Sequence, residues 1–355
     1  MKYVLIGCGR VAPSHVKAAL ANGLSVAALC DLDPEKARAL ARRFDIAPAV
    51  YTDYHEMLRA EKPDFAAIAT VSGTHAEIAV DCANAGVNFL VEKPLAMSVE
   101  DADRVLAAAE ANGVTGGVCH QNRFNEAVQA LKNAVDHGRF GRLSHGAVCV
   151  RWHRGPDYYA QDAWRGKWAT DGGTLMNQCI HGIDLLLWLM GGDAETVYGA
   201  TRNLQHPTIE GEDVGTAVLT FASGAVATVE GSVNLPADFE ETLCLFGENG
   251  AVRLGGMCVN EVVDWYFTDG EAADADRRAV REQVGNVYGN GHTSLYLDFL
   301  NALAEHRAPY VTLEAGKRAV EIVLAIYKSQ KTGLPVTLPL TGFGSADMAD
   351  VSVKR

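Results

Sequence analysis

A glycine-rich turn close to the N-terminus is the feature that most constrains the fold of this chain. The letters GCGRVA at residues 7–12 follow an apolar run at 3–6 and precede a helical pattern at 12–22. In this context G-x-G-x-x-G/A predicts a tight turn at Gly7 and close backbone approach to a pyrophosphate at Gly9. The N–H groups and dipole of the following helix favour negative charge at the same place. The pattern therefore predicts a dinucleotide-binding domain.

The spacing of apolar and helical segments predicts a two-domain α/β protein. In the first third, short apolar runs alternate with helical patterns, which is typical of a parallel sheet with right-handed crossovers. After residue 121 the runs are longer, and the turns Ser223-Gly224 and Asn249-Gly250 are typical of antiparallel hairpins. We expect an N-terminal Rossmann domain with a doubly wound parallel sheet at 1–121, a C-terminal α+β domain with a large, mostly antiparallel open sheet at 122–340, and a tail without periodicity at 341–355. The expected strands are 3–6, 25–30, 65–70, 88–91, 115–120, 143–152, 196–202, 214–221, 225–233, 242–246 and 251–254, and the expected helices are 12–22, 34–44, 75–85, 98–112, 126–137, 173–190, 294–306 and 314–332.

Asp31 ends the second apolar run, at the distance from Gly7 where dinucleotide-binding domains place an acidic residue. A carboxylate there accepts hydrogen bonds from the adenosine ribose and repels a 2′-phosphate, which favours NAD over NADP. Asp31 also fits a turn or helix N-cap before Asp33-Pro34. The two interpretations are compatible.

Composition excludes several function classes. A formal net charge of −13 argues against nucleic-acid binding, which requires basic surface. No apolar run reaches the roughly 18 residues of a membrane helix, and the first run is too short for a secretory signal. The eight cysteines include no C-x-x-C pair and indicate reduced thiols, so we expect a cytoplasmic protein. Because the eleven histidines form no H-x-x-x-H or H-E-x-x-H pair, we expect no metal site.

A second motif, Glu92-Lys93-Pro94, directly follows the fourth apolar run. With the glycine-rich turn, it resembles the glucose–fructose oxidoreductase/inositol dehydrogenase (Gfo/Idh/MocA) family along the chain to residue 340. The resemblance implies an NAD-dependent oxidoreductase in which Lys93 lies beside the nicotinamide and the reacting oxygen. It also implies a cis peptide bond between Lys93 and Pro94. An ammonium group there can stabilise developing alkoxide charge. From the residues alone, a surface lysine before a proline turn is an equal interpretation.

The segment GGTLMNQCIHGID at residues 172–184 resembles the family's glycine-rich turn and catalytic helix. Positions four apart share a helix face, so Asn177 and His181 are expected to point together. His181 is the natural general base, and Asp184 is expected to orient it. A lone histidine on an apolar helix otherwise indicates a core residue. Many family members carry aspartate at 177, and the amide present here is expected only to orient substrate or cofactor.

Asn177 resembles the nucleotide-sugar branch of the family, as do four other stretches. These are QNR at 121–123, YY at 158–159, WRGKW at 164–168 and NVYGNGH at 286–292. The resemblance implies hydride transfer to NAD from a sugar hydroxyl, at C3, of UDP-N-acetylglucosamine or its uronic acid, by a homotetramer or homodimer. The alternatives are a dehydrogenase of a free sugar or inositol, a glycoside hydrolase that uses bound NAD in a redox cycle, and a non-catalytic nucleotide sensor. A sensor would be expected to lack the lysine or the histidine.

The loop after residue 152 combines aromatic rings, which suit sugar stacking, with arginines, which suit carboxylate or phosphate. Trp152 and Trp168 fit a core or subunit-interface role equally well. The sequence at 292–293 is equally compatible with substrate contact by His292 and with a helix N-cap at Thr293. The candidate catalytic residues are Lys93 and His181; the candidate cofactor contacts are Gly7, Gly9, Arg10, Val11, Asp31, Thr70, His75, Glu92, Lys93, Trp164 and Arg165; the candidate substrate contacts are Lys93, Arg123, Tyr159, Asn177, His181 and His292.

Overall fold

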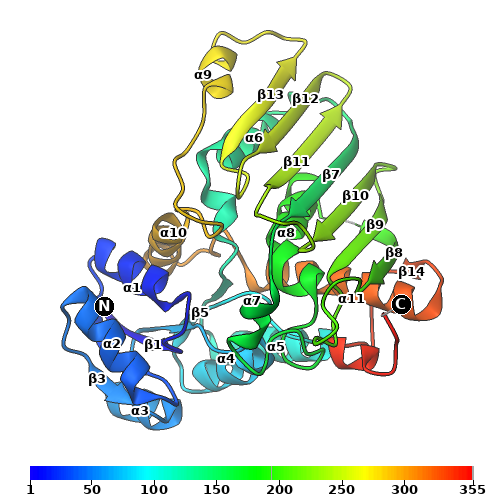
Figure 1. Ribbon diagram of the computed structural model, residues 1–355. Coiled ribbons are helices and arrows are strands. Elements are labelled where there is room, and N and C mark those ends of the chain that lie inside the picture. The colour runs from blue at the N-terminus through cyan, green and yellow to red at the C-terminus, as the bar shows by residue number, and fades with distance from the viewer. Residues whose placement is uncertain (193, 354–355) are drawn as a thin grey trace. The chain divides into compact units, whose positions relative to one another are not determined.

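The computed structural model describes residues 1–192 and 194–353, and its chain forms two compact units (Figure 1). The first unit contains Met1–His120 and His292–Lys317. The second contains Gln121–Gly291 and Arg318–Arg355. Each unit is therefore built from two separate chain segments.

The first unit is organised around a six-stranded parallel sheet. Its strand order is β3-β2-β1-β4-β5-β6, so the order reverses between β1 and β4. In such sheets the crevice at the carboxyl ends of the strands, beside this reversal, is where ligands bind. The expected Rossmann sheet is thus confirmed. The strands are β1 (Lys2–Ile6), β2 (Ser25–Cys30), β3 (Ala49–Tyr51), β4 (Phe65–Ile68), β5 (Asn88–Val91) and β6 (Gly116–Val118), and the helices are α1 (Ala12–Ala21), α2 (Pro34–Phe44), α3 (Tyr54–Glu61), η1 (Ser72–Thr74), α4 (His75–Asn84), α5 (Val99–Asn112) and α10 (His292–Glu305).

Helix α10 belongs to this unit although it lies far along the chain. It packs against α1, and its Tyr296 and Phe299 rings lie 5.5 and 5.0 Å from the ring of Phe65 in β4. Burial of this aromatic cluster accounts for the attachment. The expected continuous domain at 122–340 therefore differs from the structure, in which residues 292–317 complete the first unit.

The second unit contains an eight-stranded sheet in the order β13-β12-β11-β7-β10-β9-β8-β14. Among the strand pairs that the structure describes in this sheet, only β7 and β10 are parallel, which confirms a mostly antiparallel sheet. The turns at 223–224 and 249–250 join the antiparallel pairs β9–β10 and β11–β12, as expected. The strands are β7 (Leu143–Arg151), β8 (Ala194–Arg202), β9 (Val214–Phe221), β10 (Val226–Ser232), β11 (Glu240–Gly247), β12 (Gly250–Gly255), β13 (Glu261–Phe267) and β14 (Val336–Thr337), and the helices are η2 (Gln121–Phe124), α6 (Glu126–Asp136), α7 (Pro156–Ala160), the π-helix η3 (Leu175–Cys179), α8 (Ile180–Leu189), α9 (Asp274–Arg278), most of α11 (Leu313–Thr332) and η4 (Ser345–Met348).

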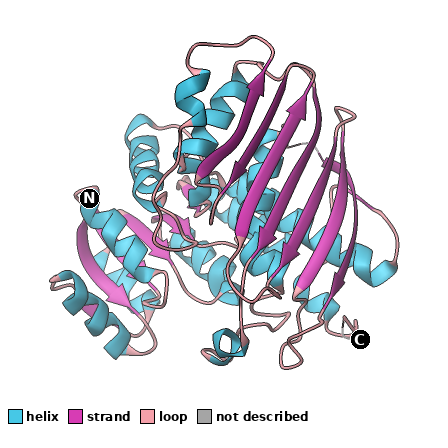
Figure 2. Ribbon diagram, turned by 45° about the horizontal axis from the view of Figure 1, so that its top comes forward, coloured by secondary structure: helices cyan, strands magenta, loops and turns pink. Residues whose placement is uncertain are grey.

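Helices of the second unit, including α6 and α8, cover one face of its sheet (Figure 2). The strands alternate buried and exposed residues, as an antiparallel sheet with one covered face should. The uncovered side carries large apolar residues that are about half exposed, among them Tyr198, Val218 and Val226.

The tail after residue 340 is held by specific contacts within the second unit. Ser345 donates its hydroxyl to the carbonyl of Trp168, and the carbonyl of Val353 accepts from the backbone N–H of Asn203. Lys331 forms an ion pair with Asp350 at 2.7 Å. Among the residues that the structure describes, no helix combines the length and apolar character needed to span a membrane.

Candidate active site

The glycine-rich turn in the first unit has the geometry that its sequence predicts. Gly7 adopts φ +96°, and a Cβ there would overlap the backbone of Ala69. A Cβ on Gly9 would meet no atom within 4 Å, so the chain is open at this point. Helix α1 begins after Val11 with no side-chain cap. The turn is thus shaped for close approach of an anionic group.

Asp31 holds the glycine-rich turn through a hydrogen bond to its backbone. One carboxylate oxygen accepts the backbone N–H of Cys8 at 2.8 Å and the other accepts that of Asp33 at 2.9 Å. The N-cap of α2 is Asp33, which accepts the N–H of Glu35, so Asp31 is the turn residue. A carboxylate has about four acceptor positions, so Asp31 retains capacity for ribose hydroxyls. Together, the open backbone at Gly9 and this carboxylate fit an adenosine diphosphate moiety.

The Glu92-Lys93-Pro94 turn leaves the end of β5, at the carboxyl edge of the sheet. The Lys93–Pro94 peptide is cis, and Lys93 is half-buried. His75 is buried, and its Nδ1 lies 2.8 Å from the carbonyl oxygen of Pro94. Burial lowers the pKa of His75, so its neutral ring donates from Nδ1 to Pro94. The Thr70 carbonyl lies 3.2 Å from Nε2, which carries no proton in this tautomer, so the hydrogen bond that supports the turn is the one from Nδ1 to Pro94.

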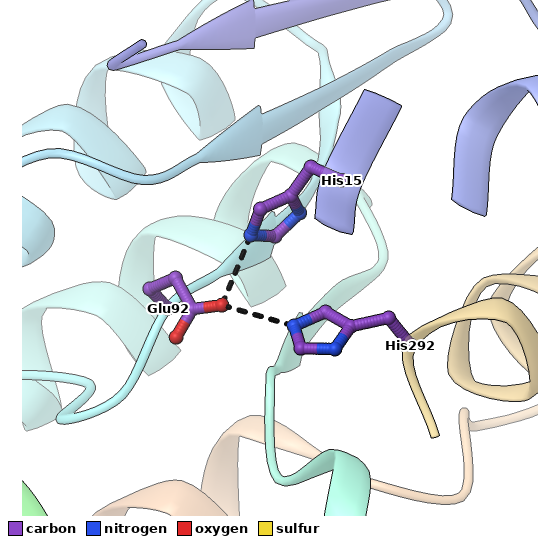
Figure 3. Close-up of side chains that lie close together, drawn as sticks. All are labelled: His15, Glu92 and His292. Carbon is purple, nitrogen blue, oxygen red and sulfur yellow. Dashed lines mark hydrogen bonds and ion pairs between the residues drawn. The ribbon is translucent and has the colours of Figure 1, made fainter. Parts of the chain in front are cut away.

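Glu92 lies between two histidines from distant parts of the chain (Figure 3). Its Oε1 is 2.9 Å from Nε2 of His15 and 3.6 Å from Nε2 of His292. The hydrogen bond from His15 and the nearby imidazole of His292 hold the pKa of Glu92 well below its usual range despite burial. The structure therefore places His292, a candidate substrate contact, beside Glu92, and makes it the first residue of α10.

In the second unit, Asn177 lies in a π-helical turn and has a fixed amide orientation. Its Nδ2 donates to Asp171, and its Oδ1 accepts from Nε2 of Gln178 at 2.6 Å. The expected single helix at 173–190 is thus divided into η3 and α8, which changes the simple four-residue register between Asn177 and His181. π-Turns of this kind often occur at functional sites. His181 is buried in the first turn of α8.

Arg123 and Asp184 form a buried bidentate ion pair. The guanidinium donates to the two carboxylate oxygens at 2.7 and 2.6 Å, and it lies over the ring of Trp188 at 4.7 Å. This pair gives Asp184 a structural partner that the sequence did not predict. Substrate contact by Arg123 stays a prediction.

Two buried glutamates, Glu212 and Glu241, lie near helices η3 and α8 and were not predicted from the sequence. Glu212 accepts the N–H of Leu175 at 2.8 Å and the hydroxyl of Tyr327 at 3.0 Å. Glu241 accepts from Asn122 at 3.3 Å. Burial raises the pKa of each carboxyl to about 8. Both are therefore protonated at neutral pH, and no local motif could have revealed them because their partners lie far away in sequence.

The aromatic and cationic loop of the second unit forms a connected cluster. Tyr158 accepts from Arg165 at 2.6 Å and from the amide of Gln178 at 3.0 Å. Trp164 and Tyr159 are half-buried, and the guanidinium of Arg165 lies over the Trp164 ring at 4.6 Å. Trp152 and Trp168 are buried in the core, which favours the core interpretation over the binding one for these two tryptophans.

Family models match both halves of the chain. The model described as "Oxidoreductase family, NAD-binding Rossmann fold" (GFO_IDH_MocA) matches residues 1–120, and the GFO/IDH/MocA C-terminal domain matches 128–253. D-apiose dehydrogenase of Paraburkholderia graminis is 34% identical over 71% of this chain and 67% of its own length. Myo-inositol 2-dehydrogenase of Thermotoga maritima is 25% identical over 93% of this chain and 96% of its own length.

Solved structures extend the similarity over the full fold. The WlbA dehydrogenase of Bordetella pertussis, in complex with NADH and UDP-GlcNAcA, is 34% identical with a TM-score of 0.87, covering 96% of this chain and 99% of its own. The WlbA enzyme of Chromobacterium violaceum, with the same two ligands, is 32% identical with a TM-score of 0.88, covering 96% of this chain and 97% of its own. The similarity therefore includes both units.

Proposed function

Because this chain belongs to the GFO/IDH/MocA family and is an NAD-dependent oxidoreductase, we propose that it oxidises the C3 hydroxyl of a nucleotide sugar, UDP-N-acetylglucosamine or its uronic acid. The observation that carries this proposal is the full-length similarity to two dehydrogenases in complex with NADH and UDP-GlcNAcA. The Asn177-Gln178 pair, held by Asp171 and Tyr158, supports the same substrate class.

The residues of the first unit would hold the dinucleotide. Gly7 and Gly9 allow the pyrophosphate to approach the backbone, with Arg10 and Val11 beside it, and Asp31 accepts the ribose hydroxyls. Bound NAD supplies the hydride acceptor. The carboxylate of Asp31 disfavours a 2′-phosphate, which agrees with NAD as the cofactor.

Two side chains would act on the substrate hydroxyl. Lys93 donates a hydrogen bond to the oxygen and stabilises its developing negative charge. His181 removes the hydroxyl proton, because the unprotonated nitrogen of a neutral imidazole can accept it. Asn177 orients the sugar, since an amide can neither take up nor release the proton. Trp164, Arg165, Tyr159 and Arg123 stay candidates for contacts around this centre.

We also propose that a second copy of this chain covers the open sheet face of the second unit, giving a cytoplasmic homo-oligomer. Tyr198, Val218 and Val226 expose apolar surface on adjacent strands β8, β9 and β10. Large exposed apolar patches on soluble proteins mark interaction sites.

A dehydrogenase acting on a free sugar or polyol is the second candidate function. The similarity to D-apiose dehydrogenase at 34% identity and to myo-inositol 2-dehydrogenase specifically favours it.

A single-turnover assay distinguishes these functions. Purified protein and NAD are mixed in stoichiometric amounts with UDP-N-acetylglucosamine, its uronic acid, D-apiose, myo-inositol or an aryl glycoside. Nicotinamide reduction is followed by absorbance and products by mass spectrometry. We expect NADH and a keto-sugar from one UDP-sugar alone. NADH from D-apiose or inositol would establish the second candidate, and aglycone release without NADH would establish a redox-cycle hydrolase.

Substitution of the two acting residues tests their roles. Lys93→Ala and His181→Ala should each lower turnover by about 10²–10⁴-fold, because each removes a group that acts in the transition state. NAD binding, measured by fluorescence titration, should persist in both. The exposed residues Lys17 and His137 provide matched alanine controls with unchanged turnover. Near-normal turnover of His181→Ala would remove the base assignment.

A further inference from the structure

A buried cluster in the first unit lies directly behind the lysine turn. His15 from α1, Glu92 after β5 and His292 at the start of α10 are each less than a tenth exposed. Figure 3 shows both imidazoles directed at the same carboxylate oxygen. We refer to these three residues as the His–Glu–His cluster. They lie 77 and 200 positions apart in sequence (15 to 92, and 92 to 292), so no local motif marks the cluster.

The hydrogen bonds on one side of the cluster have a defined direction. An ionised carboxylate only accepts, so Nε2 of His15 donates to Glu92. Burial lowers the pKa of His15, whose neutral ring must then accept at Nδ1 from the Tyr296 hydroxyl, 2.7 Å away. Tyr296 in turn accepts from the hydroxyl of Tyr3 at 3.0 Å. A chain of oriented donors therefore runs from Tyr3 to Glu92.

The other side of the cluster depends on His292. Its Nε2 is buried, has no hydrogen-bond partner among the described residues, and lies 3.6 Å from Oε1 of Glu92. The imidazole rings of His15 and His292 meet edge to face at 5.4 Å, which keeps both directed at the carboxylate. Burying a carboxylate is costly unless donors surround it. His292 is therefore placed to supply the second donor.

The His–Glu–His cluster contacts the backbone of Lys93, the residue that follows Glu92. The backbone N–H of Lys93 points to Oε2 of Glu92 at 3.3 Å, and the carbonyl of Pro94 is held by His75. The short turn is thus fixed from both sides by buried imidazoles. We infer that His15 and His292 are positioning residues that act through Glu92 to orient Lys93 for the reaction. This inference rests on the proposed role of Lys93 in substrate oxidation.

Two histidines and a carboxylate are also the donor set of many zinc sites. However, Nε2 of His15 and Oε1 of Glu92 lie 2.9 Å apart, an ordinary hydrogen-bond distance. Two ligands of one tetrahedral zinc, each about 2.0–2.1 Å from the metal, would lie about 3.3–3.4 Å apart. The oriented chain from Tyr3 already satisfies His15 without a cation. The geometry therefore favours a hydrogen-bonded cluster.

The test compares His292→Leu, which removes the donor, with His292→Gln, whose side-chain amide can replace Nε2. His55→Gln, at an exposed position of the same unit, is the matched control. With the substrate that the wild-type enzyme oxidises, His292→Leu should lower kcat by about 10–100-fold, with KM and NAD affinity nearly unchanged. His292→Gln should recover most of the loss. A raised KM with unchanged kcat would instead make His292 a substrate contact and overturn the inference, as would one equivalent of bound metal in the wild-type protein.

A second measurement needs no substrate, so it separates this inference from the proposed function. Acetylation of Lys93 by a water-soluble active ester is followed by peptide mass spectrometry, with the exposed Lys17 as internal reference. His292→Leu should change the relative rate at Lys93 by about threefold or more, because amine reactivity follows its surroundings. His292→Gln should resemble the wild type. Equal rates in all three folded proteins, checked by thermal melting, would contradict positioning of Lys93 even if UDP-sugar oxidation is established.

Discussion

At the scale of single residues, Asp31 has a structural role and, in the proposed function, a selective one. Its carboxylate holds the backbone N–H groups of Cys8 and Asp33, which fixes the glycine-rich turn to the end of β2. In the proposed cofactor site, the same negative charge faces the place where a ribose 2′-phosphate would bind. The two roles can be separated, because an amide oxygen still accepts a hydrogen bond but carries no charge.

Asp31→Asn should therefore shift cofactor preference toward NADP. We expect the ratio of kcat/KM for NADP to that for NAD to rise about tenfold, corresponding to about 1.4 kcal/mol of relieved repulsion. Steady-state kinetics with both cofactors measures this ratio, and a melting curve checks that the turn is intact. An unchanged ratio in a folded variant would show that Asp31 does not face the 2′ position.

At the scale of elements, the start of η3 depends on a protonated carboxyl group. Gly173 leaves room for Glu212, since a Cβ at 173 would overlap its carboxyl oxygens. One oxygen of Glu212 accepts from Leu175 and Tyr327, and the other, Oε2, has no partner among the described residues. Burial raises the pKa of this group to about 8, so it is largely protonated at neutral pH. The helix that carries Asn177 thus begins against a neutral acid.

This raised pKa predicts the sign of a pH effect on stability. Between its ordinary pKa and about 8, Glu212 keeps its proton when folded and loses it when unfolded, so unfolding becomes easier as pH rises. Glu212→Gln mimics the protonated group and should weaken this loss, which amounts to roughly a few kcal/mol at most. Urea unfolding at pH 5–8.5 measures it. Glu241 contributes in the same direction, so some slope should remain. Identical slopes in both proteins would contradict the assignment.

The same elements show how far the sequence predicts this structure. Strands such as β1, β4 and β9 follow from apolar runs or strict alternation, and the turns between them from Gly and Asn. The sequence patterns did not predict β3 and α3, which are short, or β14, which has two residues. They also did not predict β13, whose apolar residues alternate only in part. These segments form regular structure because each strand pairs with a neighbouring strand and the helix packs against one.

The residues of the candidate site also fall into two groups, those that the sequence predicts and those that it does not. Gly7, Lys93 and His181 are candidate site residues because family motifs mark them in the sequence. Their supporting residues were not found, because His15, Glu212 and others contact partners far along the chain. Tertiary packing alone brings such groups together, and a single sequence contains no signal of it.

At the scale of the whole molecule, the two units are interleaved along the chain. Residues 292–317 return to the nucleotide-binding unit and bring His292 to Glu92, while the chain after 318 completes the second unit. The lysine turn therefore cannot be fully formed by residues 1–121 alone. This organisation explains why the expected domain boundaries describe the chain only in part.

In the proposed reaction, hydride leaves C3 of a UDP-sugar and enters the nicotinamide ring. The most direct measurement uses UDP-N-acetylglucosamine or its uronic acid carrying deuterium at C3 only, with NAD and stoichiometric enzyme. Mass spectrometry of the reduced cofactor should show one added deuterium, and the same sugar labelled at C4 should give unlabelled NADH. Unlabelled NADH from the C3-deuterated sugar, or label transferred from C4, would exclude hydride transfer from C3.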